Sequence, residues 1–255
     1  GYNAYIDADT DDMGTQMDVG LLLMEDGDVF TFDEADKEIA VLLFSGKVTY
    51  EWSGLKVEAD RPDCFHHEAY CLLAGKGTKI TLTAHAHSEL YIQKTLNDRP
   101  FEAVMYTPET VQTEYKGSNG ELMGCMEREI KTFFDLDNAP FSNMVLGEVL
   151  NRPGKWSSYP PHHHPQPEVY FYRFDYPDGF GAGFANGEIF KTGHNGLAVI
   201  NHGFHSQTAA PGYAMCYAWG IRHLDGDPWD KTRIDDPEHA WLWKADANDH
   251  IYPNH

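Results

Sequence analysis

Short runs of apolar residues, separated by glycine and charged residues, fill most of this 255-residue chain. Examples are DVGLLLM (18–24), IAVLLFSG (39–46), KVTYEW (47–52) and ELYIQK (89–94), which have lengths typical of β-strands. No window sustains a 3.6-residue apolar period over about fifteen residues, so no long helix is predicted. Short strands with frequent glycine turns are typical of sandwiches and barrels. The pattern predicts an all-β protein, with one strand ending at Ser45-Gly46 and the next beginning after it.

The second half of the chain has the same pattern of short apolar runs separated by glycines. Glycines recur through residues 179–203, and PGYAMCYAWGIRH (211–223) is another predicted strand. A join near residues 138–145 predicts two β-barrels in tandem, over residues 1–140 and 141–255. The proline- and tryptophan-containing tail is predicted to cover the outside of a barrel.

The net charge of −21 limits the classes of partner. Nineteen Lys and Arg residues against forty Asp and Glu argue against nucleic acid, because phosphate binding depends on basic side chains. The same excess of acids argues against an anionic membrane surface, and no apolar run approaches the length of a membrane span. Four cysteines without a C-x-x-C pair indicate reduced core residues of a cytoplasmic protein, and the N-terminus does not resemble a signal peptide.

One stretch of the second half, PPHHHPQPEVYFYRF (160–174), carries side chains that bind metals. If this stretch is extended, His162, His164 and Glu168 share one face, since side chains alternate along a strand. His163 then points to the other face. Two imidazoles and one carboxylate suit a divalent ion such as Zn, Fe, Mn, Ni or Co.

The alternative interpretation is a solvated, proline-flanked histidine loop with weak metal affinity. Two observations favour the metal site: Glu168 opens the aromatic run VYFYRF, which is typical of a strand, and His205 precedes another apolar strand. A second H-x-H, His85 and His87 with Glu89 after it, has no histidine downstream before residue 150. A structural or surface role is therefore predicted for this second group.

The phrases GKWSSYPPHHH (154–164) and GFHSQTAAPGY (203–213) carry a family resemblance. The sequence resembles the 5-deoxyglucuronate isomerase family of bicupin sugar-acid isomerases, from about residue 18 to the aromatic tail. The resemblance implies two double-stranded β-helix (cupin) barrels in tandem. It also implies one divalent metal ion, Zn, Mn, Fe or Ni, in the second barrel. The ligands carried over by motif are His162, His164, Glu168 and His205.

The resemblance further implies aldose–ketose isomerisation of a deoxy-uronic acid, from 5-deoxy-glucuronate to 5-dehydro-2-deoxy-gluconate in inositol catabolism. The metal would act as a Lewis acid on the oxygens of C1 and C2, while a base moves a proton from C2 to C1. Candidate catalytic residues are Glu168, Tyr170, Tyr172 and Tyr213. For each tyrosine, core packing is the alternative role.

The substrate carboxylate also requires a cation, the more so in an acidic protein. Lys155 is the first candidate because it lies within the family motif. The alternative is that Lys155 is an ordinary surface lysine. Arg173 and Lys191 are further candidates, although Arg173 has parity opposite to Glu168.

One departure from the family pattern leaves the substrate open. Only Pro165, Gln166 and Pro167 separate His164 from Glu168, a spacing similar to that of 4-deoxy-5-hexulose-uronate isomerase of pectin catabolism. That sugar acid is the alternative substrate, and a cupin oxygenase or a sugar-binding cupin is the alternative class. The expected partner is a small sugar acid, and exposed strand edges are compatible with a homodimer.

Overall fold

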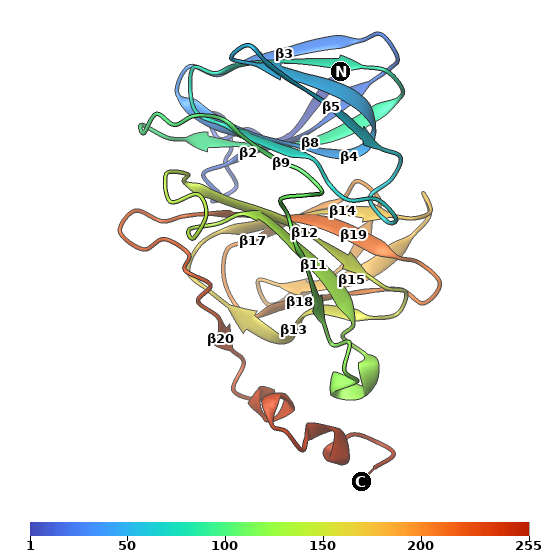
Figure 1. Ribbon diagram of the computed structural model, residues 1–255. Coiled ribbons are helices and arrows are strands. Elements are labelled where there is room, and N and C mark those ends of the chain that lie inside the picture. Colours follow the sequence, from blue (N-terminus) through green and yellow to red (C-terminus); the bar gives the residue numbers. More distant parts are fainter. Residues whose placement is uncertain (255) are drawn as a thin grey trace. The chain divides into compact units, whose positions relative to one another are not determined.

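The computed structural model describes residues 1–254, and its regular structure is almost entirely β-strand (Figure 1). The helical elements in that range are three one-turn 3₁₀ helices, η1 (Glu121–Gly124), η2 (Ala240–Trp243) and η3 (Ala247–His250). The strands are β1 (Tyr2–Ile6), β2 (Asp18–Met24), β3 (Val29–Asp33), β4 (Lys37–Trp52), β5 (Leu55–Arg61), β6 (Cys71–Ala74), β7 (Lys79–Ala84), β8 (Ser88–Leu96), β9 (Val104–Tyr106), β10 (Thr113–Lys116), β11 (Arg128–Phe134), β12 (Met144–Asn151), β13 (Trp156–His163), β14 (Glu168–Phe174), β15 (Phe180–Ala185), β16 (Glu188–Gly193), β17 (Leu197–Ile200), β18 (His205–Ala209), β19 (Met215–Arg222) and β20 (Ile234–Asp235). The prediction of an all-β protein is confirmed. Over residues 1–254, no helix has the length and apolar character that crossing a membrane requires.

The chain divides into two compact units. The first unit contains residues 1–112, 133–146 and 222–228, and the second contains residues 113–132, 147–221 and 229–255. Each unit therefore draws on segments from both sides of residue 140. The division into barrels over residues 1–140 and 141–255 stays a prediction.

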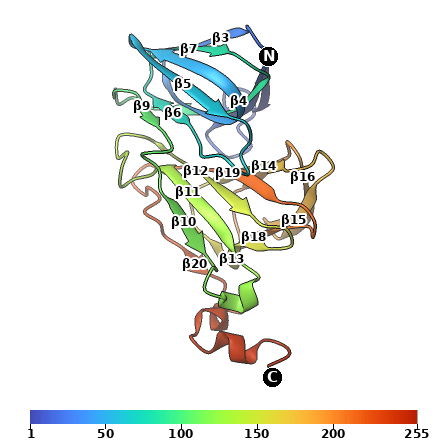
Figure 2. The same ribbon diagram turned by 45° about the vertical axis from the view of Figure 1, so that its right-hand side comes forward.

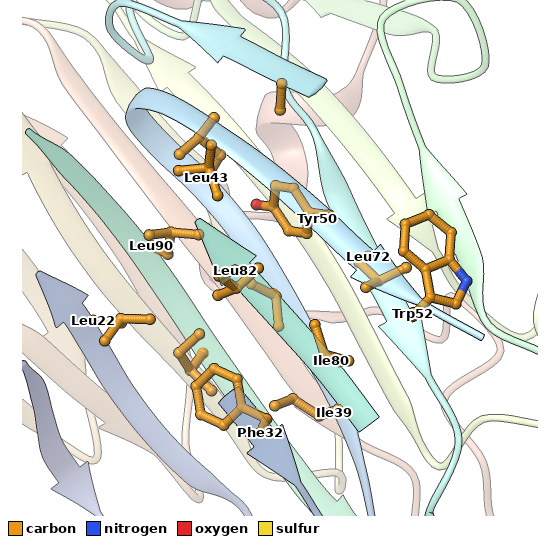
Figure 3. Packing of buried hydrophobic residues seen from close by; sticks show 14 of the residues in the cluster. Leu22, Phe32, Ile39, Leu43, Tyr50, Trp52, Leu72, Ile80, Leu82 and Leu90 are labelled. Carbon is orange, nitrogen blue, oxygen red and sulfur yellow. The ribbon is translucent and has the colours of Figure 1, made fainter. Parts of the chain in front are cut away.

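The first unit is built around an apolar core. Its nine strands form an antiparallel sheet with the path β1-β2-β8-β4-β6-β9, and β3, β5 and β7 pair beside that path. Figure 3 shows leucines, isoleucines and aromatic rings of several strands gathered in this core, among them Leu82 between Tyr50 and Leu22. Alternating apolar positions on each strand supply these side chains, as the sequence pattern indicates.

The predicted strand break at Ser45-Gly46 is wrong, because β4 is one continuous strand of sixteen residues, Lys37–Trp52, that includes both. A bulge between Leu43 and Ser45 lies at this point, and Gly46 has φ 113°. Before the bulge, odd-numbered residues such as Leu43 face the core; after it, even-numbered residues such as Val48 do. The extra residue thus changes the side-chain parity and lets one strand pair with β6 and β8 first and with β5 and β7 afterwards.

Gly46→Ala is therefore expected to lower the free energy of unfolding by about 2–4 kcal/mol. A methyl group there would lie 2.6 Å from the carbonyl oxygen of His87, in a backbone conformation that alanine rarely adopts. Gly54→Ala is the matched control, since Gly54 has φ 78° but open space around it, and should cost only about 1–2 kcal/mol. Urea denaturation measures both values, and equal losses would show that the close approach at Gly46 contributes nothing.

The second unit contains the predicted site, and two antiparallel sheets run through it (Figure 2). One has the order β10-β11-β12-β19-β14-β17 and the other the order β16-β15-β18-β13-β20. In the first sheet, Tyr170 lies opposite Trp219 and Tyr172 opposite Tyr217. In the second, Ser157 lies opposite Gln207. Directly opposite residues point to the same side of a sheet, so these registers define which side chains share a wall.

The cysteines are all free, but they are not all core residues. Cys64, Cys71 and Cys216 are buried, as predicted for reduced cysteines of a β-protein. Cys125 is exposed, next to η1, so the prediction is wrong for this residue. Cys71 and Cys216 lie within strands β6 and β19, whereas Cys64 and Cys125 both lie in turns, of which only the turn at Cys64 is covered by other residues.

Candidate metal centre

The histidine-rich stretch forms two strands and a turn, whereas the sequence pattern predicts one extended segment. β13 ends at His163 and β14 begins at Glu168. Pro165 and Pro167 lie in the connection, where the missing N–H groups prevent a continuous ladder. Because β13 and β14 belong to different sheets, the turn between them, and not alternation along one strand, determines how the histidines and Glu168 meet.

Three of the four predicted ligands converge. The Nε2 atoms of His164 and His205 each lie 3.3 Å from Oε2 of Glu168, and the ligand atoms of the three residues all lie within 4.8 Å of one another. His164, Glu168 and His205 are 8%, 4% and 1% exposed. His164 follows β13, Glu168 opens β14 and His205 opens β18, so three strand ends build the group.

His162 lies beside this group but outside its closest atoms. It faces His205 across the β13–β18 ladder, and the two ring centroids are 4.3 Å apart. His163 packs its ring against Phe204, with centroids 5.1 Å apart, and so points elsewhere, as the sequence indicated. The four-ligand set remains a prediction, with His162 as its outermost member.

The donor chemistry of this group fits a divalent metal ion. Nε2 of His205 has no hydrogen-bond partner among the described residues although it lies close to Glu168, and Nδ1 of His162 and of His164 are likewise unpartnered and buried. Burial lowers the pKa of His162 well below its usual range and lowers the pKa of His205 to about 4, so both imidazoles keep free lone pairs at neutral pH. Histidine nitrogens and one carboxylate are the ligands of many Zn, Mn, Fe and Ni sites.

Hydroxyl groups adjoin the carboxylate. The Tyr170 hydroxyl donates to Oε2 of Glu168 at 3.2 Å and lies 3.0 Å from Oγ of Ser158. Tyr172, two residues along β14, has a buried hydroxyl without a partner among the described residues. Burial raises the pKa of both tyrosines well above the ordinary value, and the Glu168 carboxylate adds to this effect. Both phenols therefore hold their protons.

The remaining predicted residues are not brought to this group. Tyr213 packs near Tyr176 and Phe180, with ring centroids about 6 Å away. Lys155 donates to the carbonyl of Gly124 at 2.6 Å. The other two candidate cations are also engaged elsewhere: Arg173 donates to Asn195, and Lys191 lies over the ring of Phe180. Lys155 is close to the histidines in the sequence motif, but the Lys155 side chain points toward η1.

The first-half H-x-H lies at a bend and not in a strand. His85 and His87 are exposed; Nε2 of His85 lies 2.7 Å from Oγ1 of Thr49, and Nδ1 of His87 lies 2.8 Å from Glu25. Nε2 of His87 lies 3.3 Å from Glu89. These contacts fit the structural role that the sequence indicated for the group.

Sequence reasoning missed several polar residues of the same unit. Gln207 is fully buried, both of its amide atoms lack partners in the described residues, and it follows His205 by two positions on β18. Nε1 of Trp219 is also buried and unpartnered, and Tyr217 bonds Ser157 with 2.5 Å between the hydroxyl oxygens. Gln207 could have been predicted, because it lies two positions after His205 and so faces the same side of the strand. Trp219, Tyr217 and Ser157 could not, because their place depends on which strands pair and in which register.

The fold and the site together define a cupin, a β-barrel protein with a histidine and carboxylate cluster at strand ends. Over 89% of its length the chain matches an IolB-like protein from Salmonella typhimurium with a TM-score of 0.80, 18% identity and 90% of that chain covered. A cupin 2 conserved barrel domain protein from Leptotrichia buccalis matches with a TM-score of 0.52 and 12% identity over 87% of this chain and 88% of its own. The predicted cupin fold is confirmed.

The chain belongs to the KduI/IolB family, whose sequence profile matches residues 2–242. It is 22% identical to the 5-deoxy-glucuronate isomerase of Geobacillus thermodenitrificans, over 86% of this chain and 83% of that protein. It is 24% identical to the 5-deoxy-glucuronate isomerase of Bacillus subtilis strain 168, over 89% of this chain and 88% of that protein. The predicted family and the predicted isomerase class are confirmed.

Proposed function

We propose that this protein is a metal-dependent aldose–ketose isomerase that converts 5-deoxy-glucuronate to 5-dehydro-2-deoxy-gluconate, a step of inositol catabolism. The observation that carries the proposal is the convergence of His164, Glu168 and His205 in a family whose relatives bear that isomerase name. These three residues would hold the divalent ion, with His162 as the fourth ligand. An ion bound there would supply Lewis-acid chemistry toward the oxygen atoms of the sugar.

The reaction balances without an oxidant or a reductant. The C–H bond of the hydroxyl-bearing carbon next to the aldehyde breaks, and a new C–H bond forms at the aldehyde carbon. The proton of that hydroxyl group moves to the former aldehyde oxygen. The hydroxyl-bearing carbon is thereby oxidised to a ketone, and the aldehyde carbon is reduced to an alcohol. Negative charge develops on the sugar oxygens between these two proton transfers, and this charge is what the protein must stabilise.

Two tyrosines have separate roles in this proposal. Tyr170 connects Ser158 to Glu168 by hydrogen bonds and therefore positions the carboxylate. The Tyr172 hydroxyl is free of such bonds, so it is the one we assign to the sugar oxygen on which charge develops. The buried walls of the unit exclude water from both groups.

Gln207 is assigned to a hydroxyl of the sugar. An amide that is buried with neither atom bonded is costly in the free protein, and a ligand hydroxyl would satisfy it. Gln207→Met is expected to leave the melting temperature unchanged or higher while it lowers kcat/KM about 10–100-fold. Thermal denaturation and steady-state kinetics measure the two effects. A lower melting temperature with unchanged kcat/KM would assign Gln207 to the fold alone.

The test of the overall proposal is proton NMR of the purified, metal-loaded protein with 5-deoxy-glucuronate in D2O. We expect the aldehyde signal to disappear and deuterium to enter the former aldehyde carbon. The short Pro165–Pro167 spacing favours a second candidate, 4-deoxy-5-hexulose-uronate, which the same assay tests. Turnover of that sugar alone would reassign the substrate, and turnover of neither would refute the isomerase proposal.

A further inference from the structure

The second unit contains a cavity of about 570 Å³ that none of the predicted site residues lines. Strands β10 and β11, the turn η1 and the C-terminal segment from Leu242 to Asn248 form its wall. Figures 1 and 2 both show η1 beside the C-terminal 3₁₀ turns, where Leu122, Met126 and Ala247 form a small apolar cluster. The volume falls within the range of about 300–1,000 Å³ that is typical of small-molecule sites.

The charge of this cavity is opposite to that of the chain. Its wall carries four cationic side chains, Lys116, Arg128, Arg233 and Lys244. Among the described residues that line it, the one acid is Glu121. The whole chain has 19 basic and 40 acidic residues, so cations are strongly concentrated here. Such a local reversal attracts an anion out of a solution that the remaining surface repels.

Arg128 is the most deeply buried of these cations. It is 7% exposed, and its Nη1 donates to the carbonyl of Met126 at 2.9 Å. No carboxylate within residues 1–254 forms an ion pair with it, whereas Arg233 pairs with Asp235 at 2.6 Å. A guanidinium has five N–H donors, and burial without a counter-charge is expensive. That burial also lowers the pKa of Arg128 below its usual range.

The cavity adjoins the metal-ligand group. Arg233 precedes β20, whose Asp235 lies directly opposite His162 in the β13–β20 ladder. Arg233 also donates to the carbonyl of Pro160, two residues before His162. Arg128 on β11, Tyr170 on β14 and Tyr217 on β19 also belong to one sheet. Arg233 thus connects the cavity wall to the strand that carries His162, and the assignment of Arg128 requires a ligand long enough to reach from the histidines into the cavity.

We propose that Arg128 binds the carboxylate of the sugar acid, and that this cavity receives the carboxylate end of the substrate. The proposal rests on the proposed function for the identity of the sugar, but its binding step requires no turnover. The planar guanidinium matches a carboxylate through two parallel hydrogen bonds, and the low exposure of Arg128 strengthens both. Lys155, the candidate from sequence, is committed to the carbonyl of Gly124 and does not line the cavity.

The test is titration calorimetry of the metal-loaded protein with two probes, D-glucuronate and the uncharged methyl β-D-glucoside. We expect the wild type to prefer glucuronate, and Arg128→Gln to weaken glucuronate binding about 10–100-fold while glucoside binding stays the same. Arg152→Gln is the matched control, because Arg152 is exposed and pairs with Glu129 on the surface. Arg128→Lys keeps the positive charge but loses the planar guanidinium, so its loss of glucuronate affinity should be intermediate. This variant also provides the test if Arg128→Gln does not fold.

Two results would overturn the assignment of Arg128. One is a wild type with no preference for glucuronate over the glucoside, and the other is a folded Arg128→Gln or Arg128→Lys variant with wild-type glucuronate affinity. Kinetics with 5-deoxy-glucuronate then separate the two proposals. Loss of glucuronate binding in the variant, together with a wild type that turns over neither sugar acid, supports the Arg128 site and refutes the isomerase. An unchanged KM in the variant of an active enzyme refutes the Arg128 site alone.

Discussion

His205→Ala is expected to reduce the metal content of the purified protein from about one divalent ion per chain to a trace, and to abolish turnover. Loss of a residue that only supports a ligand costs about 10–100-fold in affinity, so the loss of a ligand should cost more. His205 is 1% exposed and its Nε2 lies 3.3 Å from Glu168, so no solvent-exposed group can easily replace it. Elemental analysis after dialysis measures the metal, and circular dichroism checks that the β-structure remains.

His163→Ala is the matched control for this variant. His163 belongs to the same H-H-H run, but its ring packs against Phe204 and it should keep both metal and activity. His162→Ala separates a three-ligand from a four-ligand site, because only the latter predicts metal loss comparable to that of His205→Ala. Full metal occupancy in the His205 variant would remove the proposed site.

The sequence carried enough information to predict that His164, Glu168 and His205 belong to one group. The H-x-H, the glutamate before an aromatic strand and a later histidine are local patterns, and each sits at the end of a strand where a barrel gathers its ligands. Alternation along a single strand does not explain why these residues meet, since Pro165 and Pro167 divide the stretch between two sheets. Equal parity still put Glu168, Tyr170 and Tyr172 together, because those three share β14.

The cation that we propose for the carboxylate could not be predicted in the same way. Arg128 lies more than thirty residues before the histidines and carries no motif, and the fold alone makes it part of a cavity. Lys155 was favoured by its closeness in sequence, yet its side chain turns away. The length of strand β4 is equally hard to predict. In the sequence Gly46 resembles a turn residue, but in the structure it lies next to a bulge within one continuous strand. Position in the chain predicts neighbours along a strand, whereas these features depend on contacts between distant strands.

The second large effect is expected for Tyr172→Phe, which should lower kcat about 10²–10³-fold with metal content unchanged. The hydroxyl of Tyr172 is buried and unpartnered among the described residues, so its removal takes no hydrogen bond from the free protein. Stability should therefore stay equal or rise, since a buried hydroxyl without a partner is unfavourable. A loss of turnover without a loss of stability is what a role toward the substrate predicts.

Tyr50→Phe provides a stringent control, because the Tyr50 hydroxyl is equally buried and unpartnered but lies in the apolar core of the first unit. That variant should match Tyr172→Phe in stability and the wild type in kcat. Tyr170→Phe differs from both: it removes the hydrogen bond to Glu168, so it should weaken metal retention as well as turnover. If Tyr172→Phe retained wild-type kcat with its metal bound, the hydroxyl would have no part in the reaction, and stabilisation of the developing charge would have to come from other groups around Glu168.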